Sequence, residues 1–147
     1  QYNALGKLYT YSVWLSRDYA PPRLRPFVWP CGPLNLDLMQ EAAKHLLGRR
    51  DFASLRNVGA DYTSTVRTIT KAELAPQEGG QALLTVWRFQ ADGFLKQMVR
   101  NIKGLLADVG RGKLAPDAVP AILNACDRRA SPATAPPSGL TLAKVYY

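Results

Sequence analysis

The sequence contains few residues that could bind a metal and no long apolar run. His45 is the only histidine, and Cys31 and Cys126 form no CxxC pair, so no zinc ligand set at a recognised spacing can be assembled. A Cys–His nucleophile pair is formally possible, but we favour two buried thiols and a surface histidine on a helix. No stretch reaches the roughly 18 consecutive apolar residues of a transmembrane helix, so no membrane span is expected.

The N-terminal sequence QYNALGKLYTYS lacks both the apolar core and the cleavage site of a signal peptide. It also lacks an initiator methionine and leads almost directly into a strand pattern, which indicates a fragment of a longer protein. The sparse cysteines fit a reducing compartment, and we expect a cytoplasmic protein.

Acidic residues are scarce relative to basic ones. The 19 Lys and Arg residues against 11 Asp and Glu give a net charge of +8 and a pI near 9.8. Such a balance suits a polyanion-binding surface, although many basic proteins bind no nucleic acid. The charges are dispersed along the chain, which argues against a disordered basic tail. Because 47% of the 147 residues are apolar and no interior linker occurs, we expect one globular domain over residues 1–147.

The strongest helical pattern runs from Phe94 to Gly110, where apolar residues recur at the spacing of one buried helix face. Arg100 lies on the opposite, polar face of the helix. That polar face is either solvated or lines a cleft, and periodicity alone favours solvation. Its neighbours around the helix are Lys96, Gln97, Lys103 and Gly104. Glycine costs about 1 kcal/mol relative to alanine inside a helix, so Gly104 predicts a close approach by another part of the chain.

Strict alternation from Lys7 to Leu15 predicts a β-strand. One face of this strand presents Lys7 beside Tyr9 and Tyr11, and a cation next to two aromatic rings can hold phosphate and stack a base. In the alternative interpretation, which the alternation alone favours, both tyrosines pack in the core with their hydroxyls at its rim.

The segment from Tyr19 to Pro33 contains five prolines and is expected to be an irregular loop. Arg23 and Arg25 lie in it, close to Phe27. Arginines interleaved with aromatic residues are compatible with RNA contact, and a proline-rich loop held by its aromatic side chains explains them almost as well.

The remaining pattern completes the order β-α-β-β-α-α-β. This order predicts an α+β fold, a mainly antiparallel sheet with helices packed on one face. Residues 49–56 are expected to form a charged connection and residues 76–80 a hairpin turn. The other expected elements are a helix capped by Asn35, strands at Thr65–Leu74 and Gln81–Ala91, a helix capped by Asp117, and a strand at Leu140–Tyr147.

Seven stretches that cover nearly the whole chain occur in the order of one known family. They are KLYTY (Lys7–Tyr11), MQEAA (Met39–Ala43), RDFASLR (Arg50–Arg56), TVRTI (Thr65–Ile69), GFLKQMVRNIKGLL (Gly93–Leu106), DRRASPATAPPSGL (Asp127–Leu140) and the final VYY. Together they resemble the tRNA pseudouridine synthase A family, and MVRNI followed by TAPPSGL is the most specific part. Two small departures, at Arg50 and Leu55, lie outside the family's active-site positions.

The resemblance implies a homodimeric enzyme that isomerises uridine to pseudouridine in the anticodon stem-loop of tRNA, without cofactor or metal. It also implies a fold of two similar α+β halves, joined through one central sheet with a basic cleft between them. This chain resembles only the C-terminal half. The GRTDxGVH motif that carries the family's catalytic aspartate is absent, so the nucleophile is assigned to no residue here and the chain alone is expected to be inactive.

Three residues match the family's active-site positions. Tyr9 corresponds to the tyrosine that stacks on the target uracil, Arg100 to the basic residue that pairs with the catalytic aspartate, and Leu140 to the apolar residue that packs against the pocket. The match makes a cleft-lining position for Arg100 the favoured interpretation. The basic residues expected to contact RNA are Lys7, Arg23, Arg25, Arg56, Arg67 and Lys96.

Two other functions remain open at this point. The first is a non-catalytic RNA-binding module in which Tyr9, Tyr11 and the arginines bind single-stranded RNA on the sheet. The second is a protein-interaction domain whose basic charge only confers solubility.

Overall fold

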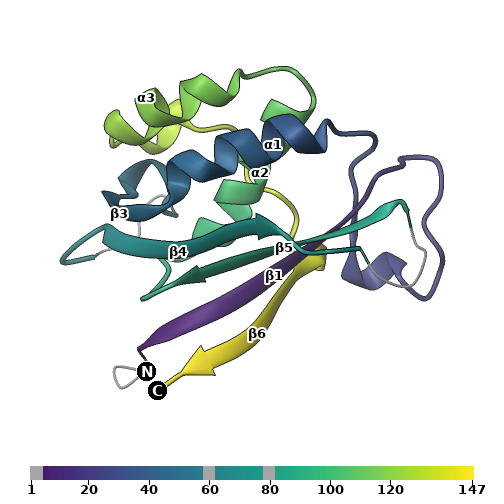
Figure 1. Cartoon of the computed structure of the whole chain (residues 1–147), viewed down its shortest axis with the longest axis horizontal. Helices are drawn as coiled ribbons and strands as arrows, with labels where there is room; N and C mark the ends of the chain where they lie inside the picture. The colour runs from purple at the N-terminus through teal and green to yellow at the C-terminus, as the bar shows by residue number, and fades with distance from the viewer. Residues whose placement is uncertain (1–4, 58–61, 78–81) are drawn as a thin grey trace.

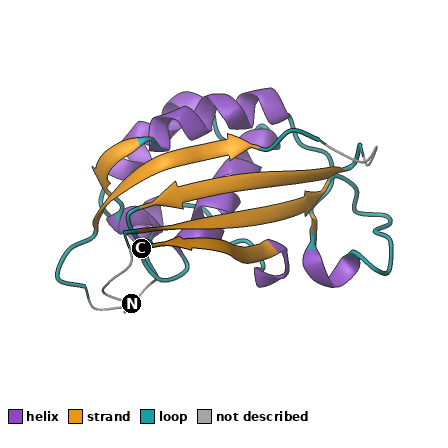
Figure 2. Cartoon of the chain, turned by 60° about the horizontal axis from the view of Figure 1, so that its bottom comes forward, coloured by secondary structure: helices purple, strands orange, loops and turns teal. Residues whose placement is uncertain are grey.

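A computed structural model describes residues 5–57, 62–77 and 82–147 of the chain. These residues form an α+β fold in which one sheet carries the helices on one face, as the sequence predicts (Figure 1, Figure 2). The strand order is β2-β1-β5-β4-β3, and β6 also pairs with β1. No helix in the described residues is long and apolar enough to cross a membrane.

The sheet is antiparallel except where β1 and β2 run parallel. Its strands are β1 (Gly6–Trp14), β2 (Trp29–Pro30), β3 (Gly48–Asp51), β4 (Val66–Leu74), β5 (Leu84–Ala91) and β6 (Leu140–Tyr146). Two strands are not predicted by the sequence pattern: β2, which lies in the proline-rich loop, and β3, which lies largely in the charged connection. Both are short edge segments whose hydrogen bonds go to distant residues. Residues 78–80 of the predicted hairpin turn and Gln81, the predicted start of the following strand, lie outside the described residues.

In the described residues three α-helices pack on one face of the sheet, and short 3-10 turns lie in the connections. They are α1 (Leu36–Ala43), α2 (Met98–Gly110) and α3 (Val119–Asn124), with η1 (Arg25–Phe27), η2 (Lys44–Leu46), η3 (Ala53–Leu55), η4 (Pro116–Ala118), η5 (Arg128–Ala130) and η6 (Pro137–Gly139). The Asn35 cap is confirmed, since its side chain accepts a 3.1 Å hydrogen bond from the Leu38 amide. The prediction that Asp117 caps a helix is wrong, because Asp117 lies inside η4 and makes no capping hydrogen bond.

Helix α2 begins four residues later than the apolar pattern predicts. Gln97, at its N-cap, has a left-handed backbone with φ of 62°, so the helical path cannot extend back through it to Phe94. The Met98 amide instead donates to the Leu95 carbonyl in a turn. Residues 94–97 therefore form a separate segment in front of the helix.

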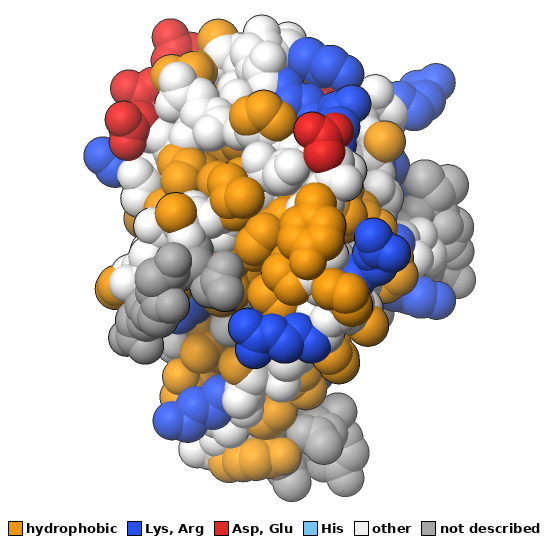
Figure 3. All heavy atoms as spheres, turned by 90° about the vertical axis from the view of Figure 1, so that its right-hand side faces the viewer, with side chains coloured by type: hydrophobic (Ala, Val, Ile, Leu, Met, Phe, Trp, Pro, Cys, Tyr) orange, Lys and Arg blue, Asp and Glu red, His pale blue; other side chains and the backbone are white. Residues whose placement is uncertain are grey.

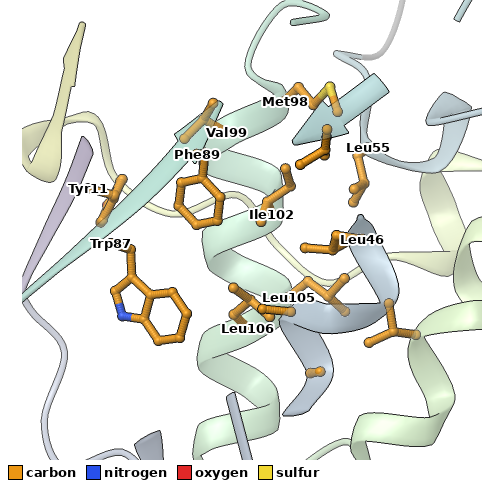
Figure 4. Packing of buried hydrophobic residues seen from close by; sticks show 14 of the residues in the cluster. Tyr11, Leu46, Leu55, Trp87, Phe89, Met98, Val99, Ile102, Leu105 and Leu106 are labelled. Atoms are coloured by element: carbon orange, nitrogen blue, oxygen red, sulfur yellow. The ribbon is translucent and has the colours of Figure 1, made fainter. Parts of the chain in front are cut away.

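The core lies between α2, α1 and the covered face of the sheet (Figure 4). The apolar stripe predicted for α2 is confirmed, with Met98, Val99, Ile102, Leu105, Leu106 and Val109 all buried. These side chains meet Tyr11 from β1 and Trp87 and Phe89 from β5, and the last two rings stack with centroids 6.4 Å apart.

The two cysteines differ in exposure. Cys31 is buried and burial raises the pKa of its thiol. Cys126 is exposed, so the prediction of two buried thiols is wrong for this residue. His45 lies on η2 and is half-buried. In the described residues no cluster of His, Cys, Asp and Glu could hold a metal ion.

Lys103 lies on the face of α2 that periodicity left polar, yet it is completely buried. Its ammonium nitrogen is 4.1 Å from the centroid of the Trp87 ring and has no hydrogen-bond partner. Burial lowers the pKa of Lys103 well below its ordinary value of 10.5, and the nearby Cys31 thiol opposes this only in part.

We expect Lys103→Met to stabilise the fold at neutral pH by about 1 kcal/mol or more. An unpaired buried charge costs several kcal/mol, whereas a desolvated cation–π contact returns about 2 kcal/mol, and methionine fills a similar volume. Because the folded-state pKa of Lys103 is depressed, the unfolded chain binds more protons between the two pKa values, and the stability this group contributes rises with pH. The advantage of the methionine variant should therefore shrink as pH approaches 10.5.

Urea denaturation of both proteins at several pH values would measure this difference. The Cys31 pKa is raised, so its contribution to stability falls above the unfolded thiol pKa in both proteins and largely cancels in the comparison. A methionine variant less stable than the wild type at neutral pH would mean that the Trp87 contact outweighs the cost of burial.

Candidate active site

Three residues taken from separate motifs, Tyr9, Arg100 and Leu140, line one pocket of about 240 Å³. Two of the predicted RNA-binding residues, Lys7 and Lys96, also line it. The pocket lies where the first half of β1, the start of β6 and the N-terminus of α2 meet. The rest of its lining comes from Phe94, Leu95, Gln97, Met98 and Val99.

Tyr9 and Tyr11 share one face of β1, but Tyr9 lies in the first half of the strand and lines the pocket, whereas Tyr11 lies further along it in the core. Tyr11 is completely buried, opposite Trp87 on β5, and its hydroxyl donates to the Pro136 carbonyl. Tyr9 is only half-buried, and its ring meets Phe94 edge to face with centroids 5.3 Å apart. Core packing, which the alternation alone favoured, is therefore confirmed for Tyr11, and base stacking stays a prediction for Tyr9 only. The Tyr9 ring packs against Phe94 and the edge of the core and keeps surface at the pocket.

Arg100 lines the pocket, and one nitrogen of its guanidinium is hydrogen-bonded to another part of the chain. Its Nε donates a 2.8 Å hydrogen bond to the Ala135 carbonyl, and the Ala135 amide returns a 3.1 Å bond to the Arg100 carbonyl. These bonds fix the direction of the side chain. Among the described residues, no carboxylate forms an ion pair with Arg100.

The N-terminus of α2 adds to the positive character of the pocket. Gln97, Met98, Val99 and Arg100 belong to the first turn or its cap and line the cavity. The unpaired amides of a first helical turn carry a partial positive charge, which favours an anion beside them. The pocket therefore suits a negatively charged group near Arg100.

The segment between α3 and β6 covers the side of α2 behind Arg100. A Cβ added at Gly104 would lie 2.0 Å from the Ala133 carbonyl oxygen, which confirms the close approach predicted from this glycine. Asn101 anchors the same segment, because its side-chain oxygen accepts hydrogen bonds from Thr134 and Arg128 at 2.6 and 3.2 Å. The segment is thus held in place up to η6, after which Leu140 enters the pocket wall opposite Tyr11.

Two more predicted RNA-binding residues adjoin the Lys96 side of the pocket. Arg67 lies 5.9 Å from the Tyr62 ring centroid, and the Tyr62 hydroxyl accepts a hydrogen bond from the Lys96 amide. Arg56 is next to Asn57, whose amide donates to the Lys96 carbonyl at 3.1 Å. The other two, Arg23 and Arg25, are exposed on the loop between β1 and β2 and do not line the pocket.

Two residues were not predicted: Phe94, which lines the pocket, and Tyr62, which accepts a hydrogen bond from Lys96 beside it. Gln97 was placed beside Arg100 on the polar helix face, and it lines the pocket. Phe94 was assigned to the buried stripe of the helix, although it lies ahead of the helix and forms a pocket wall. Gly93 immediately before it was the available signal, because a glycine there favours a break rather than a continuing helix. Nothing in the sequence pattern distinguished Tyr62.

The arrangement suits binding of an aromatic base and an anion. The pocket contains a tyrosine ring, apolar walls and cations, but none of the residues that line it is an aspartate, glutamate, cysteine, serine or histidine. The described pocket therefore offers no carboxylate, thiol or imidazole. A reaction that needs a carboxylate would require one from outside these residues.

Comparison with known proteins gives matches to one family. A family model described as tRNA pseudouridine synthase matches residues 42–147. The whole chain aligns with proteins named tRNA pseudouridine synthase A. It is 48% identical to the one of Nitratidesulfovibrio vulgaris strain Miyazaki F over 171 residues and 51% identical to that of Lawsonia intracellularis over 150 residues. The alignments cover 100% of this chain but only 62% and 58% of the two relatives, so the chain spans less than two thirds of their length.

Proposed function

The chain belongs to the tRNA pseudouridine synthase family, and from this premise we propose that it is the C-terminal part of an enzyme that isomerises uridine to pseudouridine in the anticodon stem-loop of tRNA. One observation carries the proposal. Tyr9, Arg100 and Leu140 come from three motifs far apart in the sequence and line the same pocket.

Each of these residues has a role that its surroundings support. The target uridine leaves its stack and enters the pocket, where the half-buried Tyr9 ring supplies a flat partner and Leu140 an apolar wall. The reaction exchanges the bond from the sugar C1′ to N1 for a bond from C1′ to C5; C5 loses a proton and N1 takes one up, so the product is an isomer of the substrate. Among the residues that line the pocket, Tyr9 carries the one hydroxyl that can handle the C5 proton.

Arg100 keeps a catalytic carboxylate ionised. A carboxylate enclosed in a pocket tends to take up a proton unless a cation lies beside it, and arginine remains charged at any relevant pH. The Ala135 carbonyl holds the Arg100 Nε, which leaves the terminal nitrogens for a two-point contact.

The catalytic aspartate comes from the part of the protein that this chain lacks. Residues 1–147 are then one α+β domain, the C-terminal half of the catalytic unit. Three findings support this: the greater length of the relatives, the missing carboxylate in the pocket, and the outer edge of β6. Among the described residues β6 pairs only with β1, so its other edge can be extended by further strands.

The family resemblance supports the remaining assignments. We propose that the whole protein acts as a homodimer in the cytoplasm, binds tRNA through Lys7, Lys96, Arg56 and Arg67 around the pocket, and uses neither metal nor cofactor. The alternative of a non-catalytic RNA-binding sheet is weaker, since Tyr11 is buried and helices cover that face of the sheet.

Titration of this chain with unmodified tRNA at several salt concentrations tests the RNA-binding part of the proposal. We expect weak binding whose affinity falls steeply as salt rises, because basic residues displace counterions from phosphates. Fluorescence anisotropy would measure it, with a tRNA-sized polyanion such as heparin as the control for charge alone. Salt-independent binding, or none at low salt, would favour the protein-interaction domain.

A further inference from the structure

The loop between β1 and β2, residues 15–28, is fixed in place although it lies outside the main core. Trp14, Ala20 and Val28 form a small buried cluster beneath it. The turn of η1 closes with hydrogen bonds from the Leu24 amide to the Pro21 carbonyl at 2.9 Å and from the Phe27 amide to the Leu24 carbonyl at 2.8 Å. The loop therefore presents its outward side chains in defined positions.

Two aromatic rings on this fixed loop point away from its buried cluster. Phe27 is 66% exposed and Tyr19 is 60% exposed, although the adjacent Val28 and Ala20 are almost completely buried. Leaving a large apolar ring in water on a rigid support forgoes the stability that burial would give. A ring held in this way is suited to a partner that covers it.

The charge around the two rings favours a polyanion. Arg17, Arg23 and Arg25 are exposed on the same loop, and none of them forms an ion pair with a described residue. Asp18 is the one acidic residue among residues 15–28. Figure 3 views this side of the molecule, where hydrophobic side chains gather with lysines and arginines around them. One acidic side chain borders the hydrophobic side chains in this view, and the others lie at its upper left.

The loop is joined to the pocket through η6. The Ser138 hydroxyl donates a 3.0 Å hydrogen bond to the Val28 carbonyl, next to Phe27, and η6 ends where Leu140 begins the pocket wall. An RNA strand with its target base in the pocket could thus continue over η6 and reach the loop.

We propose that Phe27 and Tyr19 form a second RNA-binding site, on which an unpaired nucleotide of the tRNA stacks outside the catalytic pocket while Arg23 and Arg25 contact its phosphates. This inference rests on the proposed function, because that function supplies the tRNA. Aromatic faces stack on any base, so the site strengthens binding and positions the substrate without selecting a sequence.

The test compares variants of the whole protein in tRNA binding by anisotropy. Phe27→Leu keeps an apolar side chain but removes the stacking face, and should weaken tRNA binding about tenfold. Phe27→Trp should retain wild-type affinity. Arg25→Gln should weaken binding and lower the slope of log affinity against log salt by about one, whereas Phe27→Leu should leave the slope unchanged. The matched controls are Leu47→Ala and Arg49→Gln. Leu47 is the exposed C-cap of η2, and Arg49 is exposed on β3, at the edge of the sheet opposite to β2.

Two results would overturn the second site. One is wild-type affinity in Phe27→Leu. The other is a Phe27→Leu protein that loses affinity together with its melting temperature or its oligomeric state, since the ring would then pack against another part of the protein or a second copy. Pseudouridine formation by the wild-type protein is measured beside the binding of the variants. This measurement distinguishes failure of the second site from failure of the proposed function. A wild type that modifies tRNA while Phe27→Leu binds normally removes only the second site, and a wild type that never modifies tRNA removes the proposed function.

Discussion

Replacing Arg100 with methionine in the whole protein is expected to lower pseudouridine formation at neutral pH by at least about a hundredfold. Removing the cation beside an enclosed carboxylate costs roughly 3–5 kcal/mol, and each 1.36 kcal/mol in the barrier is about a tenfold change in rate. The pKa of the catalytic aspartate should rise in the variant, so activity should return in part as pH increases. Single-turnover rates across a range of pH would measure both effects.

The fold of this variant should survive. Methionine leaves the Ala135 carbonyl without its donor, which costs about 1 kcal/mol, so the melting temperature should fall only modestly. Arg100→Lys should recover part of the rate, because an ammonium keeps the charge but not the planar two-point contact. A folded methionine variant with a near-normal rate would instead make Arg100 a residue that only fastens the segment around Ala135 to α2.

Two substitutions of Tyr9 should separate its contribution to tRNA binding from its contribution to the chemical step. Tyr9→Phe keeps the ring against Phe94, so tRNA binding should remain near wild type, while the rate of the bound complex falls if the hydroxyl handles the C5 proton. Tyr9→Ala removes the ring and leaves a hole in the pocket wall, so both binding and rate should fall by at least about tenfold.

Single-turnover rates and tRNA affinities of the two Tyr9 variants would be measured beside their melting curves. Thr10→Ala is a matched control on the same strand, since Thr10 is the next residue along β1 and does not line the pocket. Wild-type turnover by both Tyr9 variants would remove Tyr9 from the active site.

The sequence predicted the parts of this site that depend on local pattern. Alternation placed Lys7, Tyr9 and Tyr11 on one face of β1, and the apolar stripe placed Arg100 opposite the buried side of α2. The resemblance to a family then selected Tyr9, Arg100 and Leu140, which the fold brings to one pocket.

The errors came from contacts between distant segments. Lys103 shares the polar face of α2 with Arg100, but it is buried beside Trp87. Helical periodicity describes one helix in isolation and contains no information about this neighbour. The short strands β2 and β3 were missed for the same reason, since two to four residues carry no pattern of their own and are defined by their partners, β1 and β4. The predicted start of α2 was wrong because the backbone at Gln97 is left-handed. This conformation is more common for glycine or asparagine, so glutamine gave no signal of it.

The central claim is that this chain supplies one wall of the active site and that the reacting carboxylate comes from the rest of the protein. The measurement that tests it most directly is pseudouridine formation on unmodified tRNA by the purified chain, beside the whole protein at equal concentration. A cooperative melting curve would establish that the purified chain is folded. We predict that the folded chain binds tRNA weakly and forms no detectable pseudouridine while the whole protein converts its substrate. Product formed by the chain at a rate near that of the whole protein would contradict the claim, because the described pocket would then contain everything the reaction needs.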